Sequence, residues 1–152
     1  MALLENSTFE TGIGGWSLLN LPGPAAPQVI RNGTARSGNA FLRWSANAPM
    51  SSVAIDFIVD EPKPPRSLCA LAYVRVAPNP QPATSVSGIM KMWNLSLPGP
   101  QDANDTHFTV GSDWSILMCA IDLPLRPTTR IRLEFYYTAG VPLMDIDTVN
   151  VF

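Results

Sequence analysis

Apolar and polar positions alternate with a period of two residues along much of the chain. In residues 52–60 the odd-numbered positions are Val, Ile, Phe and Val, and the even-numbered ones between them are Ala, Asp and Ile. A two-residue period is that of a β-strand, whose successive side chains point to opposite faces. Residues 67–76 and 129–137 alternate in the same way, and the latter sets apolar residues against Arg130, Arg132, Glu134 and Tyr136. The pattern predicts strands with one packed face and one wet face.

Shorter apolar segments separated by proline and glycine extend this picture to the whole chain. Further strands are predicted over residues 40–45, 85–95, 115–123 and 145–152. The 15 prolines and 10 glycines gather in clusters between these segments, where proline cannot interrupt a central ladder of hydrogen bonds. No window has a sustained helical period, and no linker divides the sequence. We therefore expect an all-β sandwich formed by residues 1–152 as a single domain.

The charge and hydropathy of the sequence argue against some classes of binding partner. The 152 residues carry a net charge of -2, and the isoelectric point near 5.2 argues against nucleic-acid binding, which needs a basic face. No stretch is apolar for long enough to cross a membrane, and no secretory signal opens the chain. Mean hydropathy is +0.11, which favours a surface covered by neighbouring subunits, as in a homo-oligomer or larger assembly.

Candidate catalytic residues are sparse. Cys69 and Cys119 each lie within an apolar run, which favours two buried free thiols, with a disulfide between them as the alternative. Neither has a basic neighbour in the sequence to activate it. His107 is the single histidine, and its surroundings predict a solvated loop leading to a strand. The acidic residues form no motif, so we expect no enzyme activity.

Four segments in order resemble one family. They are residues 4–16 (Leu-Glu-Asn-Ser-Thr-Phe-Glu-Thr-Gly-Ile-Gly-Gly-Trp), 35–43, 108–114 and 144–151. Together they resemble the carbohydrate-binding modules attached to xylanases and other glycanases, a family also found in phage virion proteins. The resemblance implies an antiparallel two-sheet jelly-roll β-sandwich of the galactose-binding-like type.

The same resemblance implies roles for several residues. Glu10 and Asp147 match the family's ligands to a structural Ca²⁺, an ion that prefers oxygen donors. The second aspartate of the family's closing pair is Thr148 here, and the alternative is that the two carboxylates are only hydrogen-bonded at a strand end. Trp16 and Trp114 match positions that are structural in the family, so both are expected in the core.

A sugar-binding face needs exposed aromatic rings and polar side chains around them. Trp93, Tyr136 and Tyr73 are the best candidates for rings, and Arg75, Arg132 and Glu134 for hydrogen-bonding partners. The alternative is that these aromatic residues cover the second sheet or a protein interface.

These observations predict a non-catalytic binding or assembly module. Because no secretory signal is seen, the first interpretation is a phage virion surface protein made in the host cytoplasm. It would be a capsid decoration or tail protein, with glycan adhesion as a further role. Its partners would be other virion subunits, glycans, or both. The alternative is a carbohydrate-binding module excised from a secreted glycoside hydrolase, which would act outside the cell on plant or microbial polysaccharide.

Overall fold

The computed structural model describes residues 4, 8–20, 26–60, 66–78, 84–96, 103–123 and 128–152, which form ten strands and no helix. The strands are β1 (Ser17–Leu18), β2 (Gln28–Ile30), β3 (Phe41–Ser45), β4 (Ser52–Asp60), β5 (Arg66–Val76), β6 (Val86–Asn94), β7 (Ala103–Val110), β8 (Ser115–Leu123), β9 (Thr128–Gly140) and β10 (Leu143–Val151). Within this part of the chain no helix is long and apolar enough to cross a membrane.

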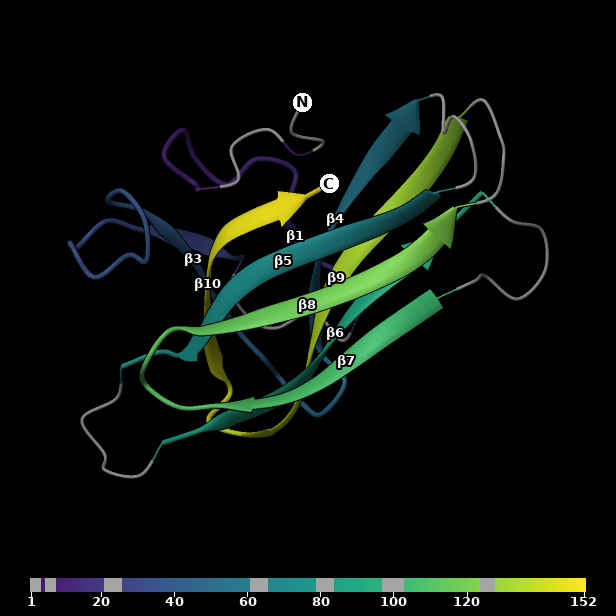
Figure 1. Ribbon diagram of the computed structural model, residues 1–152. Helices are drawn as coiled ribbons and strands as arrows, with labels where there is room; N and C mark the ends of the chain where they lie inside the picture. Colours follow the sequence, from purple (N-terminus) through teal and green to yellow (C-terminus); the bar gives the residue numbers. More distant parts are fainter. Residues whose placement is uncertain are drawn as a thin grey trace.

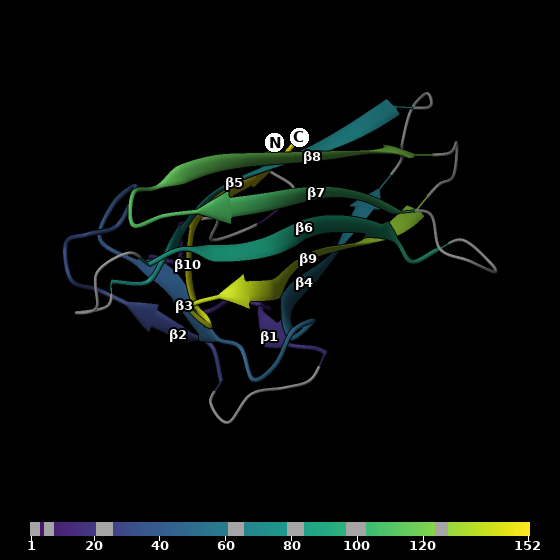
Figure 2. The same ribbon diagram turned by 90° about the horizontal axis from the view of Figure 1, so that it is seen from below.

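The strands form two five-stranded antiparallel sheets that pack face to face (Figures 1 and 2). The first sheet has the order β1-β4-β9-β6-β7, and the second has the order β2-β3-β10-β5-β8. Strands distant in the sequence are therefore neighbours in each sheet, because the chain crosses repeatedly between the two layers. The predicted antiparallel jelly-roll β-sandwich is confirmed.

The core lies between the inner faces of the two sheets. Alternation in β4, β5 and β9 places the predicted apolar sets inward, where Val53, Leu68 and Leu133 have no exposed surface. The N-terminal segment adds two aromatic rings to this core. Phe9 packs against Trp16 with ring centroids 6.0 Å apart, and Trp16 packs against Phe135 on β9 at 5.9 Å. The core position expected for Trp16 is confirmed.

One long strand was not predicted. The sequence pattern indicated a loop around His107, but residues 103–110 form β7, paired with β6 along its whole length. His107 does face solvent, with 73% of its side chain exposed. The strand has few buried side chains because it is the edge of its sheet, and Phe108 and Val110 are its buried residues. A polar edge strand lacks the apolar signal on which the prediction depended.

The two edge strands β7 and β8 lie side by side and are joined by the turn at residues 111–114 (Figures 1 and 2). Side chains of β7 reach the backbone of β8: Asn104 Nδ2 donates to Ala120 O at 2.8 Å, and Thr106 Oγ1 donates to Met118 O at 2.6 Å. These bonds occupy carbonyl groups that an open sheet edge would leave free for another chain.

The two cysteines remain free thiols. Cys69 on β5 is paired with Ala120 on β8, and Ala70 is paired with Cys119. Because side chains alternate across a sheet, Cys69 points outward while Cys119 is buried within the core. Burial raises the pKa of the Cys119 thiol. The disulfide alternative is therefore wrong, because the two thiols lie on opposite faces of the same sheet.

Candidate functional site

A cleft of about 370 Å³ opens on the outer face of the first sheet. Its lining comes from β6, from β9 and from the segment that follows β1, and it consists of Leu19, Asn20, Trp93, Arg132, Glu134 and Tyr136. Alternation on β6 and β9 turns these side chains away from the core. Four of the six residues predicted to contact a sugar are thereby brought together from positions about forty residues apart in the sequence.

Glu134 lies at the centre of this cleft. It is 2% exposed, and three neutral groups donate hydrogen bonds to its carboxylate. Ser52 Oγ donates to Oε1 at 2.5 Å, while Trp93 Nε1 and Tyr136 OH donate to Oε2 at 2.9 and 2.7 Å. Donors of this kind offset the cost of burying a charge. They also fix both aromatic side chains around the carboxylate.

The phenol of Tyr136 is held in its protonated form. Burial, followed by the hydrogen bond and the charge of Glu134, raises the pKa of Tyr136 well above its usual value. The hydroxyl therefore stays a donor toward the carboxylate, and its own oxygen is left able to accept a bond from a ligand.

Arg132 lines the cleft while paired with Asp56 on β4. Its Nε and Nη2 atoms donate to the two oxygens of Asp56 at 2.7 and 3.0 Å, and Arg130 Nη2 donates to Asp56 Oδ2 at 2.5 Å. The hydrogen bond from Arg132 is the main cause that lowers the pKa of Asp56, and the same bond raises the pKa of Arg132. This two-pronged contact fixes the plane of the guanidinium.

Three lining or supporting residues were missed at the level of sequence: Leu19, Asn20 and Ser52. Asn20 is fixed by its backbone N–H bond to Ser52 Oγ at 3.1 Å and by its Nδ2 bond to Met50 O at 2.8 Å. These residues meet the cleft because β1 pairs with β4 at the sheet edge. A two-residue strand has no sequence pattern that could have indicated this pairing.

The prediction that Tyr73 and Arg75 share this face is wrong. Both lie on β5, on the outer face of the second sheet, because β5 belongs to the other layer. The guanidinium of Arg36 covers the Tyr73 ring at 4.4 Å from its centroid. Arg75 is buried and donates to Asp145 Oδ2 at 3.0 Å, an aspartate that Arg43 also contacts at 2.7 Å. Arg75 also donates to Thr34 Oγ1 at 2.8 Å. The contacts of Arg36 and Thr34 fasten the loop before β3 onto the sheet, while the pairs with Asp145 join β3, β5 and β10.

Trp114 is also not in the core, contrary to prediction. It is half-buried on the same outer face of the second sheet. There it packs edge-on against Phe41 with centroids 5.7 Å apart, lies 4.3 Å from the Arg75 guanidinium, and donates from Nε1 to Thr34 O. Its role is structural, but it covers the sheet from outside.

Glu10 and Asp147, the predicted Ca²⁺ ligands, both accept hydrogen bonds from backbone N–H groups. Asp147 Oδ2 accepts from the backbone N–H groups of residues 36 and 37, and Oδ1 accepts from that of residue 148. Glu10 Oε1 accepts from those of residues 39 and 40, and the Arg31 guanidinium stands 3.6 Å from Oε2.

The two carboxylates therefore hold the loop of residues 36–40 through backbone N–H groups. The described residues contain no cluster of three or more side chains of the types that ligate metals. Gly38 has φ +63°, and a Cβ there would overlap the Glu10 carboxylate, so the loop is shaped to bring its amides onto that side chain. Ca²⁺ at this point stays a prediction from the resemblance.

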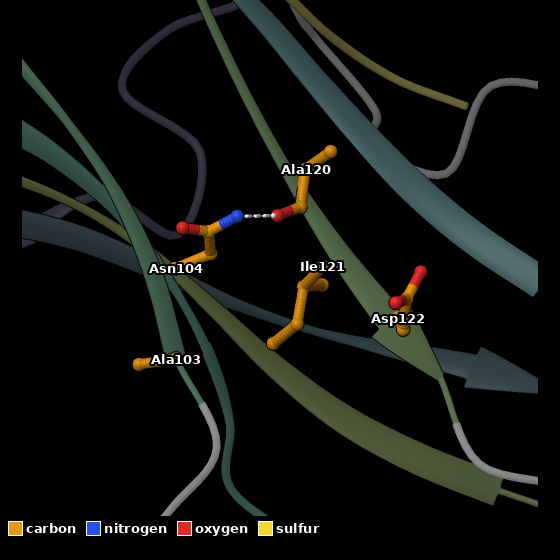
Figure 3. A pocket seen from close by; sticks show the side chains of 5 residues that line it. All are labelled: Ala103, Asn104, Ala120, Ile121 and Asp122. Carbon is orange, nitrogen blue, oxygen red and sulfur yellow. Dashed lines mark hydrogen bonds between the residues drawn. The ribbon is translucent and has the colours of Figure 1, made fainter.

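A second hollow, of about 270 Å³, lies between β7 and β8 (Figure 3). It is lined by Ala103, Asn104, Ala120, Ile121 and Asp122. The Asn104 amide is already bonded to Ala120 O across it. Because it offers no aromatic ring, it is a weaker candidate than the first cleft for holding a ligand with apolar faces.

Solved structures of other proteins share the fold that carries this cleft. No family model matches the chain, and no curated protein matches it. Among solved structures, TmCBM61 in complex with β-1,4-galactotriose has a TM-score of 0.63 at 16% identity, over 100% of this chain and 98% of that one.

Two further solved structures have a similar fold. The C-terminal family 22 carbohydrate-binding module of Clostridium thermocellum Xyn10B, studied for residues of its cleft in ligand binding, has a TM-score of 0.63 at 19% identity, over 95% of this chain and 89% of that one. The enzymatically active domain of bacteriophage CBA120 tailspike protein 4 has a TM-score of 0.64 at 11% identity, over 99% of this chain and 21% of that one. The protein described here has the two-sheet jelly-roll fold of these carbohydrate-binding modules.

Proposed function

We propose that the protein is a non-catalytic glycan-binding module and that the cleft on the first sheet is its binding site. The observation that carries the proposal is the convergence of Trp93, Tyr136, Arg132 and Glu134 on one cleft of about 370 Å³. Aromatic rings provide a surface for the apolar faces of sugar rings, and the polar groups between them can pair with hydroxyls.

The carboxylate of Glu134 is the expected hydrogen-bond acceptor for a sugar hydroxyl. An ionised carboxylate has about four acceptor positions, and three are taken by Ser52, Trp93 and Tyr136. One position is left for a ligand hydroxyl, and Glu134 lines a cleft in which the Trp93 and Tyr136 side chains are already hydrogen-bonded. A site ordered before its ligand arrives loses little conformational entropy on binding.

The arrangement favours binding over catalysis. Glycoside hydrolysis usually needs two carboxyl groups that flank the scissile bond. Glu134 is the carboxylate that lines this cleft, and the nearby Asp56 is bonded to two arginines that hold it ionised. Neither the lining residues nor their direct partners in the described structure supply a matched acid and base.

The biological setting is a second part of the proposal. A virion surface protein, on capsid or tail and assembled with other virion subunits, is supported by the similar fold of one part, 21%, of the phage tailspike domain. The alternative, an extracellular module that serves a glycanase, is supported by the carbohydrate-binding modules among the similar structures. Light scattering at micromolar concentration separates them: a stable trimer or larger assembly supports the virion setting, and a monomer supports the alternative.

Affinity electrophoresis and calorimetry test the binding site. The protein is run against β-1,4-galactan, xylan and a panel of microbial polysaccharides, with Trp93→Ala and Tyr136→Phe as cleft variants and Tyr73→Ala as the matched control on the opposite sheet. We expect at least one polymer to bind, with Trp93→Ala abolishing binding and Tyr73→Ala leaving it unchanged. Equal loss of binding in Trp93→Ala and Tyr73→Ala, or loss only in Tyr73→Ala, would place the site elsewhere.

A further inference from the structure

Lys91 holds an ammonium group over the Trp93 ring, beside the proposed binding cleft. The two residues lie two positions apart on the outer face of β6, and Nζ stands 3.9 Å from the ring centroid. Across the sheet Lys91 is paired with Glu134 on β9 and with Asp105 on β7. Directly opposite residues on neighbouring strands have Cβ atoms about 4.5–5.5 Å apart. Both charged groups also contact the same indole, because the Lys91 ammonium lies over its face and Glu134 Oε2 accepts from its Nε1.

The other cationic side chains of this face have carboxylate partners. Arg130 and Arg132 both contact Asp56, and Asp105 stands 3.8 Å from His107. Glu134 accepts its bonds from neutral donors. Within the described part of the chain, no ion pair joins Lys91 to a carboxylate. Its ammonium lies over the indole face of Trp93.

An ammonium in this position acts differently on neutral and acidic sugars. The attraction of an indole ring for a cation is modest at an exposed site. A neutral sugar ring that stacks on the indole must displace the ammonium and offers it no negative charge in return. A sugar that carries a carboxylate supplies that partner. Its hydroxyls can still reach Glu134, because Glu134 lies on β9 and Lys91 lies opposite it on β6.

Resting on the proposed function, we propose that the cleft selects acidic glycans, polysaccharides whose sugar rings bear carboxylates, and that Lys91 is the residue that determines this specificity. Glu134 accepts a ring hydroxyl, Trp93 contacts the apolar side of the ring, and Lys91 pairs with the carboxylate. Arg132 contributes less to the selection, because two of its nitrogens are bonded to Asp56.

The test compares each acidic polymer with its own neutral form. Polygalacturonate, glucuronoxylan and alginate are assayed by calorimetry beside their carboxyl-reduced counterparts, using wild type, Lys91→Met, Lys91→Arg and Arg36→Met. Methionine keeps the apolar stem over the indole and removes the charge. Arg36→Met is the matched control, because Arg36 covers the Tyr73 ring on the opposite sheet in the same manner.

We expect wild type to bind at least one acidic polymer about fivefold more tightly than its reduced form, a preference at the upper end of what one ion pair near the surface provides. Lys91→Met should lose that preference, Lys91→Arg should keep it, and Arg36→Met should match wild type. The preference should also weaken as salt increases.

Three outcomes would overturn the inference. If wild type binds reduced polymers as tightly as acidic ones, or if Lys91→Met keeps the wild-type preference for the acidic form, Lys91 does not select for acid. In both cases, binding that Trp93→Ala abolishes would leave the proposed function standing. If no polymer binds in either form, the proposed function fails together with the inference.

Discussion

Glu134 offers the sharpest test of the structure, because three side chains depend on one buried carboxylate. In Glu134→Ala, the hydroxyl of Ser52, which has no exposed surface, loses its acceptor, at a cost of about 1–3 kcal/mol. Trp93 and Tyr136 line the open cleft, where water can replace the carboxylate, so each lost bond costs about 0.5–1 kcal/mol. We therefore expect the free energy of unfolding to fall by about 3 kcal/mol.

Glu134→Gln separates the charge from the shape. The amide oxygen can accept from Trp93 and Tyr136. The amide nitrogen can donate to Ser52 Oγ, so Ser52 keeps a hydrogen bond in which it accepts rather than donates. Bonds to a neutral acceptor are weaker than those to an ion, and we expect a loss of about 1 kcal/mol. The two variants should therefore differ by about 2 kcal/mol.

Urea unfolding followed by tryptophan fluorescence measures both variants. With a denaturant slope of about 1–3 kcal/mol per molar, Glu134→Ala should lower the midpoint by about 1–3 M and Glu134→Gln by less than half as much. Asp60→Ala, an exposed carboxylate at the end of β4, is the control and should change stability by less than about 0.5 kcal/mol. If Glu134→Ala is no more destabilising than Glu134→Gln, the three hydrogen bonds do not hold the site together.

Four further predictions concern the backbone, the pH dependence of stability at two carboxylates, and the metal. A Cβ on Gly88 would overlap the backbone oxygen of Tyr136, while one on Gly111 would meet open space; Gly88→Ala should therefore destabilise by more than about 2 kcal/mol in urea unfolding, and Gly111→Ala by much less. Burial raises the pKa of Asp147, so the stabilisation of wild type relative to Asp147→Asn is full below the usual value of 3.8 and decreases as pH rises through the folded pKa; a flat or rising difference between about pH 3 and 6 would contradict this. The pKa of Asp56 is lowered, so the stabilisation relative to Asp56→Asn is full above 3.8 and is lost as pH falls through that pKa. Because backbone N–H groups already bond to the carboxylates of the predicted Ca²⁺ site, we expect a chelator to leave the melting temperature unchanged; a clear rise on adding CaCl₂ would contradict this expectation and support the calcium prediction.

The comparison of sequence and structure is most informative on β6 and β9. Both strands were predicted with the correct faces, because most of their inner positions are apolar and most of their outer ones polar or aromatic. The same reasoning placed Tyr73 and Arg75 correctly on the outward face of β5. It could not say that this face belongs to the other sheet, because alternation is a local property and gives no information about which strands are neighbours.

The edge of the sandwich was predicted less well than its centre. β7 carries the polar stretch Asn-Asp-Thr-His, which forms a strand because β6 supplies hydrogen-bonding partners along its length. Trp114 was assigned to the core from its resemblance to a structural position. Its actual neighbours, Phe41 and Arg75, come from the second sheet and cover that sheet from outside.

By itself, the sequence determined the class of fold and the inward and outward faces of the long strands, because a two-residue period and proline-rich breaks act within a few residues. Only the tertiary structure decided which outward faces became one site. The cleft exists because β9 lies between β4 and β6, so that Glu134 receives Ser52 from one neighbour and Trp93 from the other. Such pairings depend on the order of strands across a sheet, which arises from the packing of the whole sandwich and leaves no mark in any single segment.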